Sequence, residues 1–247
     1  MMRYRVLNTP VDGIDMAGAL DFVAQTVSGN GKPAFILAVN PEKVFVLRQD
    51  AFLREFFERA ALLIPDGIGM VKGLQILHGV KVSRVPGADL MQNICKEAPE
   101  RGYKIFIYGS SEEVNSGACR ELEKRHPGIQ IVGRSDGFVK PDEMEGLVEK
   151  INASGADILF IAMGSPRQEK WMSEYADKLT TVRVCQGIGG TLDTIVGTVK
   201  RAPLFWQKLG LEWFYRLLCQ PSRFKRQLRC FRFAFEVYRT KFFCPKD

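Results

Sequence analysis

Short apolar runs alternate along residues 1–199 with segments whose apolar positions repeat at helical spacing. After a short edge strand at 4–7, we expect strands at 34–39, 62–64, 104–108, 129–132, 157–162 and 182–185. Such alternation builds a parallel sheet, because each helix must carry the chain back over one face of the sheet before the next strand begins. The pattern therefore predicts an α/β fold with a doubly wound, mostly parallel, Rossmann-like sheet.

Glycine or a polar side chain follows five of these strands. The residues are Asn40, Asp66-Gly67, Gly109-Ser110-Ser111, Gly164-Ser165 and Gly187-Ile188-Gly189-Gly190-Thr191. Ligands of open α/β sheets bind just beyond the carboxyl ends of the strands. Glycines let backbone amides approach a phosphate, so the stretches at 108–111 and 187–190 are the best candidates for a pyrophosphate site. A tight turn explains any single glycine, but five such strand ends favour a ligand crevice.

One carboxylate, Asp66, stands between an expected strand and the turn Gly67-Ile68-Gly69. In this fold class, that is where chemistry is usually done. Asp is also a common helix cap, so this stretch alone leaves catalysis and capping equally open.

The segment 164–169 opens another helix beside the same crevice. Pro166 fits the first helical position with Ser165 as its cap, which places Arg167, Gln168 and Glu169 in the first turn. Glutamate complements the helix dipole there, whereas arginine does not. We interpret Arg167 as a sign of an anionic partner.

Composition excludes several classes of protein. The 247 residues are 46% hydrophobic and 26% charged, which is typical of a globular chain. Six cysteines without a C-x-x-C pair and only two histidines argue against a zinc site. The N-terminus lacks the apolar core of a signal peptide, and no apolar run approaches the roughly 18 to 20 residues of a membrane span. We expect a cytoplasmic protein with reduced thiols.

The net charge of +7 is concentrated at one end of the chain. Residues 200–247 hold 12 Lys or Arg against 3 acids, together with 12 of the 26 aromatic residues. Residues 1–199 are left with a net charge of −2. We therefore expect a Rossmann-like body at 1–199 and a basic, aromatic, helical appendage at 200–247.

The second half of the appendage can form an amphipathic helix from 222 to about 243. One of its faces collects Phe224, Leu228, Phe231, Phe235, Tyr238 and Phe242, which we call the apolar stripe. An apolar face with arginines beside it is typical of a helix in a membrane interface. A core helix packed on the body is the alternative, and both hold if one part docks and another meets lipid. Nucleic acid binding is disfavoured, because the aromatic residues do not alternate with the cations.

Seven stretches together resemble the WecG/TagA/CpsF family of bacterial glycosyltransferases, and the resemblance covers nearly the whole chain. They are Asn40-Pro41-Glu42, Pro65-Asp66-Gly67-Ile68-Gly69, Arg84-Val85-Pro86-Gly87, Gly164-Ser165-Pro166-Arg167-Gln168-Glu169, Gly187-Ile188-Gly189-Gly190, Arg201-Ala202-Pro203, and Leu211-Glu212-Trp213-Phe214-Tyr215-Arg216-Leu217 with Pro221-Ser222-Arg223. Their order and spacing make the resemblance specific.

The resemblance implies an inverting transferase that needs neither a metal nor a cofactor. Such enzymes move a sugar, often N-acetylmannosamine or its uronic acid, from a UDP donor to N-acetylglucosamine on undecaprenyl diphosphate, as in teichoic acid synthesis. The partners would be a UDP-sugar, a lipid-linked diphosphate and an anionic membrane surface, with no nucleic acid and with a homo-oligomer left open. The protein would lie at the inner face of the cell membrane.

The resemblance also assigns roles to residues. Asp66 matches the general base, and Gln168 and Arg84 match residues that contact donor or acceptor. Three arginines of the appendage match a group that closes over the pocket and meets the diphosphate. The expected substrate-binding set is Asn40, Arg84, Gly109, Ser110, Gln168, Glu169, Gly187, Gly189, Arg216, Arg223 and Arg226. Ala38 stands where related sequences commonly have threonine, which leaves the donor sugar open.

Three alternatives remain at this point. The same reaction could use another UDP-sugar, such as N-acetylmannosaminuronic acid or glucose. A non-enzymatic, membrane-binding nucleotide sensor would explain the appendage but not the polar strand ends. An NAD-dependent oxidoreductase would need a G-x-G-x-x-G fingerprint and an acid about 20 residues further on, and the sequence lacks this fingerprint.

Overall fold

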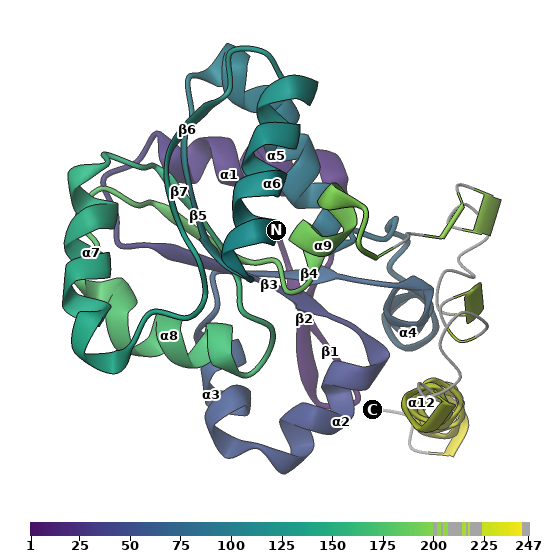
Figure 1. Ribbon diagram of the computed structural model, residues 1–247. Coiled ribbons are helices and arrows are strands. Elements are labelled where there is room, and N and C mark those ends of the chain that lie inside the picture. The colour runs from purple at the N-terminus through teal and green to yellow at the C-terminus, as the bar shows by residue number, and fades with distance from the viewer. Residues whose placement is uncertain (200–201, 204, 207–213, 216, 218–223, 244–247) are drawn as a thin grey trace.

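A computed structural model describes residues 1–199, 202–203, 205–206, 214–215, 217 and 224–243. Its centre is a six-stranded sheet in the order β4-β3-β8-β7-β5-β6, in which every neighbouring pair is parallel (Figure 1). The strands are β3 (Ala34–Val39), β4 (Leu62–Pro65), β5 (Lys104–Gly109), β6 (Gln130–Ser135), β7 (Ile158–Ala162) and β8 (Val184–Gly187). The predicted fold class is confirmed.

Helices cover both faces of the sheet. One apolar core cluster joins a face of the sheet to α2 (Pro41–Gln49), α3 (Ala51–Arg59), α4 (Ile68–His78), α7 (Met144–Ala153), α8 (Arg167–Tyr175) and α12 (Phe224–Phe243). The other cluster joins the opposite face to α1 (Met16–Val27), α5 (Gly87–Arg101), α6 (Glu112–Arg125) and α9 (Thr191–Val196). Two 3₁₀ turns, η1 (Pro141–Glu143) and η2 (Ala176–Lys178), complete the described elements. Alternate strand residues point to opposite faces, so with helices on both faces the central strand β7 is buried throughout, whereas the edge strand β6 is only partly buried.

The first segment differs from its prediction. It forms an antiparallel hairpin, β1 (Arg3–Val6) and β2 (Thr9–Asp12), separate from the main sheet. The sequence predicted a single edge strand at 4–7. Leu7 and Asn8, with φ values of 51° and 66°, make the two-residue turn that hairpins of this kind need. The chain therefore reverses early enough for Pro10 to pair with Arg5.

A buried carboxylate fastens this hairpin to the sheet. Asp12 is fully buried, and it accepts two hydrogen bonds from the Arg3 guanidinium, both at 2.9 Å. It also accepts one from the Leu63 N–H at 2.7 Å, while Arg3 reaches the Ala60 carbonyl at 2.9 Å. Charge-assisted, bidentate pairs of this kind hold their geometry well. The hairpin therefore braces β4, the strand that leads to Asp66.

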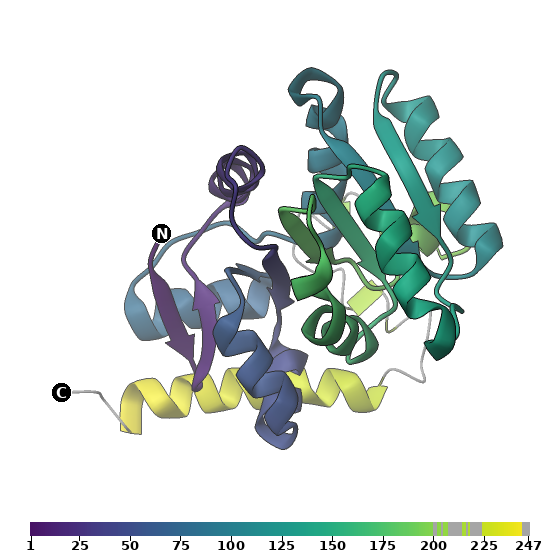
Figure 2. The same ribbon diagram turned by 90° about the vertical axis from the view of Figure 1, so that its left-hand side faces the viewer.

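The helix α12 packs along α4 and α2 (Figures 1 and 2). Phe233 and Val237 are buried in the core, and Glu236 pairs with Arg48 of α2 at 2.7 Å. At 100° per residue, these buried side chains lie opposite the apolar stripe, whose described members are all exposed. One face of this helix therefore docks on the body, as the core-helix interpretation predicts, and contact of the exposed face with a membrane stays a prediction.

Two further predictions concern membrane-spanning helices and the boundary between body and appendage. None of the described helices is long and apolar enough to cross a bilayer. The expected boundary between 199 and 200 adjoins residues outside the described part of the chain, so the division into two parts stays a prediction.

Candidate active site

A cavity of about 880 Å³ lies at the carboxyl ends of β4, β3 and β8. Its size is within the usual range for small-molecule sites, and its position is the one that doubly wound sheets use for ligands. Helices α2, α3, α4, α5, α8, α9 and α12, together with loops such as the one that carries Arg84, supply the rest of its described lining.

The structure brings seven predicted site residues together in this cavity. They are Asn40, Asp66, Arg84, Gln168, Glu169, Gly187 and Gly189. Arg216 and Arg223 lie outside the described residues. The backbone of Arg226 belongs to α12, but its side chain is not described.

Gly109 and Ser110 are not among the described residues that line the cavity. A Cβ atom on Gly109 would lie 2.6 Å from the backbone of Ala162, and this residue has a φ of +120°. The Ser110 N–H donates to the Ala162 carbonyl at 2.9 Å, and the Ser110 carbonyl accepts from Gly137. The close approach of β5 to β7 therefore accounts for glycine at position 109, and no ligand is needed to explain it. The part of Gly109 and Ser110 in binding stays a prediction.

Asp66 follows β4 and lines the cavity, and backbone hydrogen bonds to two neighbouring segments fix its position. Its N–H donates to the Val39 carbonyl at 2.8 Å, and the Val85 N–H donates to the Pro65 carbonyl at 2.8 Å. These bonds place the strand end beside β3 and beside the loop that carries Arg84. The N-cap of α4 is Gly67, and this helix has no side-chain cap. The alternative interpretation of Asp66 as the N-cap residue of α4 is therefore wrong.

Asn40, by contrast, does cap a helix. Its side chain accepts from the Lys43 N–H at 2.9 Å at the start of α2, as its position before Pro41 predicts. The expected cap of α8 differs: Pro166 is the N-cap and Arg167 begins the helix, so Ser165 has no capping role. The Ser165 hydroxyl instead accepts a hydrogen bond from Lys43.

Gln168 is fixed by the two glycines at the end of β8. Its side chain is buried, and its Oε1 accepts from the Gly189 N–H at 3.2 Å. A Cβ atom on Gly187 would lie 2.4 Å from Gln168 Nε2. Glycine at 187 therefore makes room for the amide of Gln168, and the Gly189 N–H orients it. The sequence analysis instead explained both glycines by a pyrophosphate bound to their backbone amides.

Lys43 is a cavity residue that the sequence analysis missed. Its Nζ donates to Ser165 Oγ at 2.7 Å, lies 3.4 Å from Glu169 Oε1 and sits 5.1 Å from the centre of the Phe57 ring. Glu169 is 1% exposed, and no described residue donates a hydrogen bond to its Oε2. The signal was the spacing from Asn40, because a residue three places after an N-cap lies in the same first turn.

The described lining carries slightly more acid than base. The carboxylates are Glu42, Asp66, Glu169 and Asp193, and the cations are Lys43, Lys72 and Arg84. Glu169 faces Lys43, and Glu42 lies 3.6 Å from Arg229 of α12. A diphosphate would need more positive charge than these residues provide. Among the residues that the structure describes, no group of three or more His, Cys, Asp or Glu is placed to hold a metal ion.

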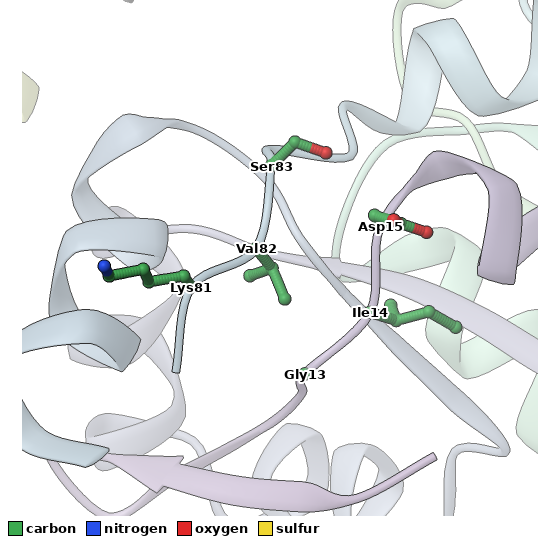
Figure 3. Close-up of a pocket in the computed structure, with 6 residues that line it drawn as sticks. All are labelled: Gly13, Ile14, Asp15, Lys81, Val82 and Ser83. Atoms are coloured by element: carbon green, nitrogen blue, oxygen red, sulfur yellow. The ribbon is translucent and has the colours of Figure 1, made fainter. Parts of the chain in front are cut away.

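A second hollow, of about 570 Å³, lies between the start of α1 and the segment after α4 (Figure 3). Gly13, Ile14, Asp15, Lys81, Val82 and Ser83 line it. The Asp15 carboxylate caps α1 by accepting from the Gly18 N–H at 2.9 Å, and the Lys81 side chain extends away from Asp15 (Figure 3). None of these residues ends a strand of the main sheet, so the larger cavity is the candidate active site.

The fold and this cavity define a doubly wound α/β protein whose ligand site lies at the carboxyl edge of the sheet. The model of the Glycosyl transferase WecG/TagA/CpsF family matches residues 4–246. The match spans nearly the whole chain, so the protein belongs to this family. It is a glycosyltransferase of cell-surface polysaccharide synthesis, with a sugar donor and an acceptor as its substrates.

Proposed function

We propose that the protein transfers N-acetylmannosamine from a UDP donor to N-acetylglucosamine on undecaprenyl diphosphate, with inversion and without a metal. The observation that supports this most is Asp66, a carboxylate at a strand end that lines the cavity and is not the N-cap residue of α4. An inverting transfer needs one general base, and a single positioned carboxylate suffices.

In this reaction, Asp66 takes the proton of the acceptor hydroxyl while that oxygen attacks the anomeric carbon of the donor. The bond from this carbon to the UDP oxygen breaks, and UDP leaves with the electron pair. Attack from the face opposite UDP inverts the anomeric centre. Negative charge on the leaving diphosphate is stabilised by donors that are already in place. Arg84 is the arginine that the described lining provides for this.

Further positive charge comes, in our proposal, from Arg216, Arg223 and Arg226. The described lining holds four carboxylates against three cations, so bound diphosphate requires cations from elsewhere. Guanidinium groups suit this role, because they bind phosphate oxygens in a bidentate fork. The appendage would thereby act as a lid that completes the site.

We further propose that the lid closes at the membrane. The exposed members of the apolar stripe, from Leu228 (50% exposed) to Phe242 (69%), supply an apolar anchor. Anionic lipid attracts basic residues beside such a face. Arg229 and Arg232 serve docking, because Arg229 faces Glu42 of α2 and the Arg232 guanidinium lies 5.0 Å from the centre of the Phe45 ring of α2. The exposed Arg239 and Lys241 are better placed to meet lipid.

The test is an assay of UDP release with a panel of UDP-sugars and a short-chain N-acetylglucosamine diphosphate lipid. We expect UDP-N-acetylmannosamine to be the best donor. Faster turnover with UDP-N-acetylmannosaminuronic acid or UDP-glucose would support the same reaction with a different donor sugar. Ala38, which lines the cavity, leaves the identity of that sugar open. Absence of transfer from every UDP-sugar to this acceptor would contradict the proposal. A thermal-shift comparison of UDP, NAD and an oligonucleotide separates the other classes.

A further inference from the structure

One end of the candidate active site is apolar and lies between α4 and α12, which pack side by side (Figure 1). We call it the α4–α12 groove. Its apolar lining is Ile68 and Ile76 from α4 with Phe231, Phe233, Val237 and Tyr238 from α12. The other end of the cavity holds Asp66 and the polar strand ends. The lining therefore differs along the cavity: it is mostly polar at the strand ends and mostly apolar between α4 and α12.

Close packing builds the floor of this groove. Phe233 is 2% exposed, and a Cβ atom on Gly73 would lie 3.3 Å from its ring. A Cβ atom on Gly69 would lie 3.8 Å from the same ring. The two glycines of α4 thus let the aromatic ring of α12 approach the helix backbone, and the groove is a formed part of the fold.

The groove continues onto the surface. Phe231 and Tyr238 line the cavity, yet they are 62% and 54% exposed and belong to the apolar stripe. Phe235 and Phe242 belong to the same stripe and are 67% and 69% exposed, but they are not among the described lining residues. An apolar path therefore runs from the cavity that holds Asp66 to the outer face of α12.

The order of chemical groups along α4 fits one kind of molecule. Asp66 precedes the helix, Lys72 lines the cavity within it, and Ile76 lies one turn beyond Lys72. With a rise of about 1.5 Å per residue, Lys72 and Ile76 lie roughly 6 and 12 Å along the axis from Ile68. After Asp66 and the adjoining Ile68, the cation Lys72 and then the apolar Ile76 follow along the helix. A sugar hydroxyl, a phosphate and a hydrocarbon chain follow one another in the same way in a lipid-linked sugar.

We propose that the α4–α12 groove binds the first isoprene units of the acceptor, with Lys72 facing the phosphate that joins them to the sugar. This inference rests on the proposed function, because it concerns the acceptor of the same site. The groove then guides the acceptor from the apolar stripe, and hence from the membrane, to Asp66. Each methylene buried in such a groove raises affinity about fourfold before the costs of ordering are subtracted.

The test uses N-acetylglucosamine diphosphate acceptors that carry one, two or three isoprene units, in solution without membranes. For the wild-type protein, we expect KM to fall about tenfold or more from one unit to three. The variant Phe231→Ser/Tyr238→Ser should lose most of this dependence. The matched control, Phe235→Ser/Phe242→Ser, removes two equally exposed rings from the same stripe and should keep it. Pelleting with anionic vesicles should weaken for both variants.

The proposal would be overturned if KM depended on the number of isoprene units in the same way in the Phe231→Ser/Tyr238→Ser variant and in the wild type. Equal KM values for isoprenoid and straight alkyl acceptors would also contradict the proposed isoprene site. So would a second copy of the protein that occupies the groove, detected as a molecular mass in solution that rises with protein concentration. If no acceptor of any length is used, the proposed function fails. The groove is then tested by thermal shift: farnesyl diphosphate, but not inorganic diphosphate, must stabilise the wild type more than the Phe231→Ser/Tyr238→Ser variant.

Discussion

Replacing Lys43 by methionine should destabilise the protein much more than loss of an ordinary lysine. The Lys43 side chain is 13% exposed and its partner Glu169 is 1% exposed, with 3.4 Å between Nζ and Oε1. Methionine keeps the apolar stem of the side chain and removes the charge. Glu169 would then be a carboxylate buried without its cation.

The geometry sets the size of this effect. At an effective dielectric constant of about 20, two charges at this distance attract by about 5 kcal/mol, from which the cost of removing both from water must be subtracted. Removing one partner of a buried pair costs about 3 to 5 kcal/mol. We take about 3 kcal/mol, because the contact is longer than an ideal hydrogen bond. In a chain of this size, the melting temperature should fall by roughly 6 to 12 °C.

The assay is thermal unfolding of a set of variants. Lys32→Met is the matched control: Lys32 and Asp177 are 2.9 Å apart, but their side chains are 83% and 76% exposed, so its melting temperature should stay near that of the wild type. The double variant Lys43→Met/Glu169→Gln should recover most of the loss, because it leaves no charge buried. If Lys43→Met melts at the same temperature as Lys32→Met, the pair does not stabilise the fold and our interpretation of Glu169 is wrong.

Three further predictions concern the candidate active site and the appendage. Gly187→Ala should displace Gln168, because the new Cβ would lie 2.4 Å from its amide nitrogen, and kcat should drop at least tenfold. The control is Gly146→Ala, because a Cβ atom on Gly146 would point into open space. Equal kinetics for the two variants would refute the role of Gly187. Activity should survive EDTA, and strict dependence on magnesium or manganese would contradict the metal-free mechanism. Arg239→Glu/Lys241→Glu should weaken vesicle pelleting most at low salt, because each basic residue near an anionic surface contributes about 1 kcal/mol; unchanged pelleting would exclude both residues from the lipid contact.

The fold and part of the site could be predicted because their signals are local. Buried parallel strands produce apolar runs, and the polar residues that follow those runs meet at one edge of the sheet. Asp66, Asn40 and Gln168 were found in this way. The apolar stripe was also predictable from helical spacing alone, whereas the buried face of α12 was not, because Phe233 and Val237 are recognised only once α4 is seen beneath them.

The features of the site that could not be predicted from the sequence depend on contacts between segments that are distant in the chain. The spacing from Asn40 places Lys43 in the first turn of α2, but its buried partner Glu169 is recognised only when α8 brings it, 126 positions later, beside α2. A glycine that packs against a backbone, as Gly109 does on Ala162, resembles a glycine that binds phosphate. Two helices, α2 and α3, connect β3 to β4, and they meet at Asp50, which ends one helix and caps the next by accepting from the Leu53 N–H.

The most direct test of the central claim compares Asp66→Asn with Asp193→Asn in the UDP-release assay. Both carboxylates line the cavity and both are half-buried, and the substitutions keep their shape while removing basicity. If Asp66 is the general base, Asp66→Asn should lose about 100-fold or more in turnover while UDP binding and melting temperature stay unchanged. Asp193→Asn should retain most of its turnover. Wild-type turnover in Asp66→Asn, above all together with its loss in Asp193→Asn, would contradict the account.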